Sequence, residues 1–249
     1  MHMDTKIKIE KIQLSDHFTY YKLIRFVLPS IGMMVFTSVY VIVDGLFVSN
    51  VVGKTAFASI NLVMPIVMLV GALGFMAGTG GAALVSKTLG EQRNERANQY
   101  FTMLIGATTI AGTIVCILAY IFMDSICLAL GADSDMMQDC VTYGRIAMCF
   151  NVFFMLQNCF QDFFIVAAKP HLGLLTTVIA GLSNIILDAL FIYVFNWGVA
   201  GAAVATGISE MVGAAIPIIY FIKPNTSLLS LVKCKLELQP ILKASGNGI

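Results

Sequence analysis

Charge is scarce in this chain. Only 12% of the 249 side chains are Asp, Glu, Lys or Arg, whereas soluble domains carry roughly 25%. The few Lys and Arg residues stand singly at the ends of apolar runs, without the clustered basic and aromatic residues of a nucleic-acid surface. With 58% hydrophobic residues and a mean hydropathy of +0.87, the composition predicts an integral membrane protein and excludes a nucleic-acid partner.

Catalytic and cofactor motifs are also absent from the sequence. It contains no HExxH, GxSxG or CxxC motif and no Cys/His cluster. His2, His17 and His171 all lie outside the apolar runs. The six cysteines fall mostly within those runs, where they are expected to pack as small apolar side chains. We therefore expect neither an enzyme, nor a cofactor, nor a dedicated metal centre.

What the chain has instead is long apolar runs. A membrane-spanning helix needs about 20 mostly apolar residues. Six segments meet this requirement: 26–49, 57–86, 98–123, 141–165, 172–195 and 199–222. The predicted fold is an all-α membrane protein, with an amphipathic cytoplasmic N-terminus (1–25), a six-helix lobe (26–222) and a cytoplasmic linker (223–249). The segment 57–86 is long for one straight span and is expected to tilt or to bend at Pro65.

The positions of Lys and Arg predict the orientation. If the N-terminus is cytoplasmic, all but two of the 15 basic residues fall in the N-terminus or the inner connections, and only Lys54 and Arg145 lie outside. Short cytoplasmic loops carry such an excess of basic residues. Both termini are thus expected in the cytoplasm, in a multi-pass protein of the plasma (inner) membrane.

Against this apolar background, a few polar residues inside the spans are conspicuous. Asp44 ends a long run without charge, and Asn184 with Asp188 and Thr206 with Glu210 interrupt later runs. A carboxylate in hydrocarbon is costly unless it is protonated or paired, so such residues commonly bind or move a cation. Each of the two later pairs has a four-residue spacing, which places its members on one helix face.

The predicted orientation puts these groups at one depth. Asp44 lies about 8 Å below the outer end of its span, and Asp188 and Thr206 about 10 Å below the ends of theirs, at about 1.5 Å per residue. We therefore expect a shared pocket that holds H⁺ or Na⁺: neighbouring carboxylates retain a proton, and amide and hydroxyl oxygens suit Na⁺. The residues do not choose between the two ions.

Simpler interpretations of each residue stay open. Asp44 and Asp188 can be acids at the membrane surface, and Asn184 can bond a neighbouring helix. Thr206 can bond the backbone of its own helix, and Glu210 can serve packing between lobes.

Gly74 with Gly78, and Ala77 with Gly81, have the spacing that allows two helices to approach closely.

Several segments together resemble the multidrug and toxic compound extrusion (MATE) family. VDGLFVSNVVG (43–53) is similar to the family's first-helix signature, and LSNIILDALFIYVFNWGVAGAAVATGISE (182–210) to its fifth and sixth helices. Lys169-Pro170 matches the usual inner turn. The resemblance covers nearly the whole chain in the right order.

The resemblance implies an antiporter that exports cationic or amphipathic compounds, driven by H⁺ or Na⁺. It assigns Asp44, Asn184, Asp188 and Thr206 to a cation site, and gives Glu210 no counterpart. Because family members have about twelve spans, we expect this chain to be the N-terminal lobe, partnered by a second six-helix lobe or, alternatively, by a homodimer mate.

Other functions remain as alternatives. A lipid-type flippase of the same superfamily and a non-transporting membrane scaffold both fit six apolar spans. A channel would need a continuous polar stripe, whereas the polar groups here cluster at one depth.

Overall fold

The computed structural model describes residues 20–234, 244 and 246, and these contain helices but no β-strand. The elements are α1 (Tyr20–Phe47), η1 (Val48–Val52), α2 (Lys54–Gly90), α3 (Asn94–Ile121), α4 (Met123–Ala129), α5 (Met137–Val166), α6 (Pro170–Asp188), η2 (Ala189–Val194) and α7 (Gly198–Ile222). Six segments are long and apolar enough to span a membrane. The predicted all-α fold with six spans is thus confirmed.

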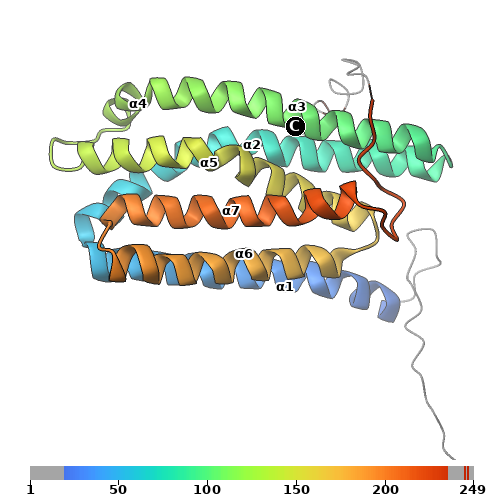
Figure 1. The fold of residues 1–249 in the computed structure, drawn as a ribbon, viewed down its shortest axis with the longest axis horizontal. Coiled ribbons are helices and arrows are strands. Elements are labelled where there is room, and N and C mark those ends of the chain that lie inside the picture. Colours follow the sequence, from blue (N-terminus) through green and yellow to red (C-terminus); the bar gives the residue numbers. More distant parts are fainter. Residues whose placement is uncertain (1–19, 235–243, 245, 247–249) are drawn as a thin grey trace, which may run out of the picture.

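The long helices run roughly along one axis and give the bundle two ends (Figure 1). We call one the π end, because it carries the π-helices η1 and η2 together with the 122–136 connection. We call the other the strap end, because residues 223–234 leave α7 there as an extended strap. The described chain begins at the strap end too, so the first described residue and the strap share one end. The predicted amphipathic segment 1–25 lies mostly outside the described residues, as does most of 235–249.

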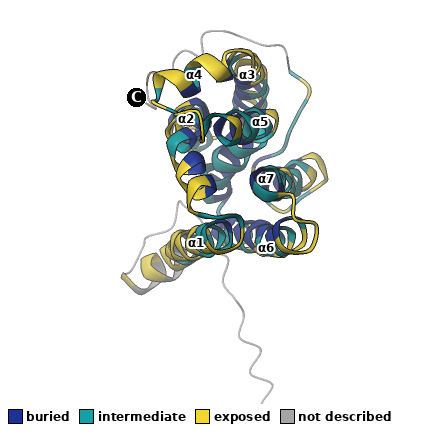
Figure 2. Ribbon diagram, turned by 90° about the vertical axis from the view of Figure 1, so that its left-hand side faces the viewer, coloured by how far each residue is buried: buried dark blue, intermediate teal, exposed yellow. Residues whose placement is uncertain are grey.

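Two groups of helices are visible in the view along the bundle (Figure 2). Helices α2, α3 and α5 pack together and form what we call the frame, whereas α1 packs against α6 as a separate pair. Helix α7 lies between the two groups and contacts both α5 and α6. Helix α2 crosses the bundle obliquely, as its length leads one to expect. It continues through Pro65 as one helix.

The frame is packed backbone to backbone. A Cβ added at Gly74 would lie 2.5 Å from the backbone of Met155, and one at Gly78 would lie 3.1 Å from the Cα of Cys159. The interpretation of this glycine spacing as a close-packing surface is therefore confirmed. Asn151 of α5 donates a hydrogen bond of 3.2 Å to the carbonyl of Val67 in α2. This bond adds a polar contact to the same interface.

An aromatic core closes the frame towards the strap end. Phe101 of α3, Phe160 and Phe163 of α5 and Phe221 of α7 are all fully buried. The ring of Phe101 lies 4.6 Å from that of Phe163 and 5.0 Å from that of Phe221, between centroids.

All six cysteines are free, and four of them are buried, in accordance with the packing role predicted for them.

The strap runs over α3. The N–H of Ser230 donates to Oδ1 of Asn98, and that of Val232 donates to Oγ1 of Thr102. The N–H of Leu231 donates to the carbonyl of Phe221 at the end of α7. Three hydrogen bonds donated by the strap's N–H groups therefore join the beginning of α3 to the end of α7.

Candidate functional site

The predicted acids of the first and fifth spans are neighbours in the structure. Asp44 of α1 and Asp188 of α6 both lie near the π end, and their carboxyl groups are within hydrogen-bonding reach of each other. Asp188 is completely buried. Neither of its oxygens, nor Oδ1 of Asp44, has a hydrogen-bond donor among the described residues.

This lack of donors matters because two ionised carboxylates can only accept hydrogen bonds. A bond between Asp44 and Asp188 exists only if one of them holds a proton, and otherwise a cation must lie between them. An unpaired charge in so buried a place costs several kcal/mol, on the order of the penalty for burying an ion in protein. The buried oxygens of the pair therefore favour a proton or a cation between them.

Asn184 and Thr206 extend the same cluster. Nδ2 of Asn184 donates a long hydrogen bond of 3.4 Å to Oγ1 of Thr206, which joins α6 to α7. Asn184 is buried, and its Oδ1 also lacks a donor. Because Asn184 lies one turn from Asp188 on α6, this free carbonyl oxygen is available on the face that carries the acid.

Glu210 lies one helical turn beyond Thr206 on α7 and is only partly buried. It interacts electrostatically with Tyr40 of α1 and Tyr143 of α5. The structure thus places Glu210 beside the predicted site rather than on a remote face of α7.

Sequence reasoning missed the two tyrosines. Tyr143 is buried in α5 and interacts with Asp44, Asp188 and Glu210, while Tyr40 interacts with Asp44 and Glu210. The sequence contains a signal for both tyrosines. Tyr40 precedes Asp44 by four residues and so shares its helix face, and Tyr143 lies near the predicted outer end of its own span. We call the following residues together the acid cluster: Tyr40, Asp44, Tyr143, Asn184, Asp188, Thr206 and Glu210.

Burial is uneven within the acid cluster. Asp188 and Asn184 are almost completely buried, whereas Asp44, Thr206 and Glu210 retain some exposure. A cation bound by Asp188 would therefore be surrounded by protein on one side and approached from the other.

No basic side chain neutralises the acid cluster within the described part of the chain. The ion pairs there join Arg145 to Asp124 and Arg93 to Glu91, and both lie outside the cluster. Arg145 also lies over the ring of Tyr120, 5.7 Å from its centroid. Residues 20–234 likewise hold no group of three or more His, Cys, Asp or Glu with metal-binding geometry. A bound Na⁺ would thus depend on the amide and hydroxyl oxygens of the cluster as well as on its two paired acids.

Both π-helices border the acid cluster. η2 begins directly after Asp188, and η1 begins four residues after Asp44. π-helices are rare and are frequently found at functional sites. Their presence beside both acids marks the π end as the specialised end of the bundle.

Comparison with known proteins finds relatives that match most of this chain. "Multidrug export protein MepA" of Staphylococcus haemolyticus is 26% identical over 211 residues, which cover 85% of this chain and 47% of that protein. MepA of Staphylococcus aureus strain MRSA252 is 26% identical over 208 residues, 84% of this chain and 46% of the relative. This chain spans about half the length of these relatives, which are named as export proteins and not as enzymes.

Solved structures show the same fold. A MOP superfamily transporter from Pyrococcus furiosus matches with a TM-score of 0.82 at 22% identity, over 91% of this chain and 51% of the other. A structure described as MATE in the bent conformation matches with a TM-score of 0.83 at 21% identity and the same coverage. The MatE family model matches residues 29–190. The chain therefore belongs to the MatE family.

Proposed function

We propose that this chain is the cation-binding lobe of an antiporter, which takes up H⁺ or Na⁺ and exports cationic or amphipathic compounds. The observation that carries the proposal is the Asp44–Asp188 pair, in which three buried carboxylate oxygens lack a donor. A cation bound to this pair removes the free-energy cost of burying unpaired carboxylates, and its release restores that cost. The site can thus convert an ion gradient into a difference between two conformations.

The export function rests on the family and on the relatives' names. The relatives are multidrug export proteins about twice as long as this chain, which supports a partnership with a second six-helix lobe. We propose that this chain is the N-terminal lobe, with the strap end and both termini in the cytoplasm and the π end outside. The flippase and scaffold alternatives gain no specific support, since neither needs two unpaired acids side by side.

Cation binding can be tested without a second lobe. The chain is placed in lipid nanodiscs, and proton uptake is titrated between pH 5 and pH 9, with and without 100 mM NaCl (~0.1 M, near physiological ionic strength). We expect uptake of about one proton by the acid pair, which Na⁺ suppresses if Na⁺ is the coupling ion. Asp188→Asn should abolish this uptake, and Asp44→Asn should abolish or greatly weaken it.

The matched control is Asp135→Asn, because Asp135 is an exposed acid in the 122–136 connection. This variant removes the same charge and should leave the buried uptake unchanged. Wild-type uptake that is indifferent to Asp188 would refute the cation site.

Transport is then tested in vesicles with an imposed pH or Na⁺ gradient and a cationic dye. Dye movement that follows one gradient and is lost in Asp188→Asn supports coupled export and names the ion. If the chain needs a second lobe, movement appears only when that lobe is supplied. Dye movement that persists in Asp188→Asn would contradict coupling through this site.

A further inference from the structure

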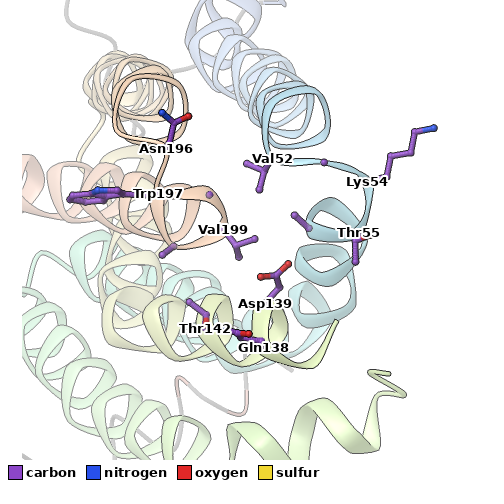
Figure 3. Close-up of a pocket in the computed structure, with 13 residues that line it drawn as sticks. Val52, Lys54, Thr55, Gln138, Asp139, Thr142, Asn196, Trp197 and Val199 are labelled. Atoms are coloured by element: carbon purple, nitrogen blue, oxygen red, sulfur yellow. The ribbon is translucent and has the colours of Figure 1, made fainter. Parts of the chain in front are cut away.

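A pocket of about 410 Å³ opens at the π end, where α2, α5 and α7 begin (Figure 3). None of the acid-cluster residues lines it. Its polar lining includes Lys54, Thr55, Gln138, Asp139, Thr142 and Asn196. The proposed function assigns no role to this pocket.

Asp139 gives the pocket its negative charge. Figure 3 shows its carboxylate between α2 and α5 and directed into the space, whereas the side chain of Lys54 extends away from it. Within residues 20–234, no Lys or Arg forms an ion pair with Asp139. An unpaired acid in a concave polar pocket attracts small cations from solution.

Tyr143 lies on α5 one helical turn from the pocket and belongs to the acid cluster. It follows Asp139 by four residues on α5, so that it lies on the same helix face about 6 Å further in. Tyr143 interacts in turn with Asp44, Asp188 and Glu210. Its phenol both donates and accepts hydrogen bonds, so that it can relay a proton or offer an oxygen to a metal cation.

Buried apolar residues lie beside the pocket. Ala56 and Val199 line the pocket and are both 5% exposed. They belong to one buried apolar cluster with Tyr143, Val48 of η1 and Ile192 of η2. The apolar side chains of this cluster cannot replace the hydration shell of a cation, whereas the phenol of Tyr143 supplies one oxygen among them.

We propose that this pocket is the outer antechamber of the coupling cation. Asp139 concentrates the cation there, and Tyr143 passes it to the Asp44–Asp188 pair when the layer formed by Val48 and Ile192 opens. This inference rests on the proposed function of the acid pair. It adds a binding pocket and a route to that function.

The test compares the rate of cation uptake with the amount of cation bound at equilibrium. The chain in nanodiscs is mixed rapidly from pH 9 to pH 7 in the presence of the dye pyranine, and proton uptake is followed with time. A parallel experiment jumps the Na⁺ concentration at constant pH. We expect Asp139→Asn to slow uptake about tenfold at low ionic strength, since steering by one sign of charge raises association rates by about 10 to 10³. The final amplitude should stay the same.

Salt and matched variants make the test specific. The effect of Asp139→Asn should fade above about 0.5 M salt, because the Debye length is then only a few Å. Asp135→Asn removes an equal charge outside the pocket, and should keep the rate within about twofold of wild type. Tyr143→Phe should slow uptake at every salt concentration, because it removes the connecting hydroxyl rather than a charge.

Trp197 provides a second measurement, because it is the chain's single tryptophan and lines the pocket. Caesium ions should quench its fluorescence more strongly in wild type than in Asp139→Asn at low salt. Equal quenching in the two proteins would count against a cation in the pocket.

Two outcomes overturn the antechamber and leave the cation site standing. One is an uptake rate in Asp139→Asn equal to that in Asp135→Asn. The other is loss of the equilibrium amplitude in Asp139→Asn, which would make Asp139 part of the binding site itself. Failure of the proposed function looks different, since wild type would then show no uptake that depends on Asp188.

Discussion

The frame and the α1–α6 pair are built on different principles. In the frame, glycines bring α2 against the backbone of α5, and buried phenylalanines fill the space towards the strap end. In the pair, a Cβ added at Gly32 of α1 would lie 3.7 Å from the end of Leu174 of α6, and one at Gly181 of α6 would lie 2.6 Å from the ring of Phe36 of α1, so that side chains rather than backbones meet these glycines. Only 6% of the most apolar window of the first span is buried inside the lobe. The frame is therefore tightly packed, whereas α1 has few partners within this lobe.

The acid cluster lies at the border between these two regions. Asp44, Asn184 and Asp188 come from the pair, Tyr143 from the frame, and Thr206 and Glu210 from the helix between them. Under the proposed function, a cation bound there joins α1, which has few partners within the lobe, to the well-packed α5 and α7. Its binding and release would then bias the position of α1 without disturbing the frame.

The largest effect should come from glycine substitutions on the two sides of this comparison. Gly74→Ala places a methyl group 2.5 Å from the backbone of Met155, which no rotamer change can relieve. We expect it to lower the free energy of unfolding by about 3 kcal/mol. Gly32→Ala meets only the flexible end of Leu174 and should be nearly neutral. Unfolding in detergent with increasing SDS measures both, and equal losses would remove the distinction between frame and pair.

Phe101→Ala tests the aromatic core of the frame. It leaves a cavity among Phe160, Phe163 and Phe221, and we expect the free energy of unfolding to fall by about 3 kcal/mol. Val39→Ala in the exposed part of α1 removes apolar surface that has few partners in the lobe, and should change stability little. The melting temperature of each variant in the same detergent gives the comparison. A neutral Phe101→Ala would mean that the frame is as loosely packed as the pair.

Thr206→Val sharpens the comparison at the border itself. The variant keeps the shape of the side chain but removes the oxygen that accepts from Asn184. We expect cation affinity to fall by about tenfold, near 1.4 kcal/mol, with little change in stability. The control is Thr177→Val, because Thr177 is a buried threonine of α6 that bonds Gln161 and Gly173 away from the acids. Proton or Na⁺ titration should show the loss only for Thr206→Val.

The smallest effect is expected for the ion pair at the π end. Arg145 and Asp124 are both substantially exposed, at 40% and 53% of their side-chain surface. Exposed ion pairs contribute little, so Asp124→Asn should cost about 0.5 kcal/mol and leave cation uptake unchanged. Thermal unfolding at low and high salt measures this difference. A loss of uptake would instead show that the π end communicates with the acids through α4.

Much of the fold could be predicted from the sequence because span length and hydropathy determine it. The six predicted spans correspond in order to α1 with η1, α2, α3, α5, α6 with η2, and α7. Short α4 was missed, since seven residues are too few for a periodic signal. The π-helices were missed as well, because a shift in backbone hydrogen bonding depends on tertiary packing rather than on residue type.

The site was predictable where charge or spacing made it visible. Asp44 and Asp188 were found because acids are rare in the spans, and Asn184 and Thr206 because of their four-residue spacing to acids. Tyr40 and Tyr143 were missed because tyrosine is common near membrane surfaces and carries no charge. The pocket around Asp139 could not be found, because its walls come from three helix starts that are far apart in sequence.

The strap determines which helices are free to shift. Its N–H groups tie Asn98 and Thr102 of α3 to the chain that follows Phe221 of α7. Sliding or turning α7 about its own axis would break these bonds together, at about 1 kcal/mol each. Helix α7 is thereby anchored to the frame, and Thr206 and Glu210 serve as fixed reference points. Under the proposed function, we therefore expect the movement that follows cation exchange in α1, which has few partners within the lobe, rather than in α7.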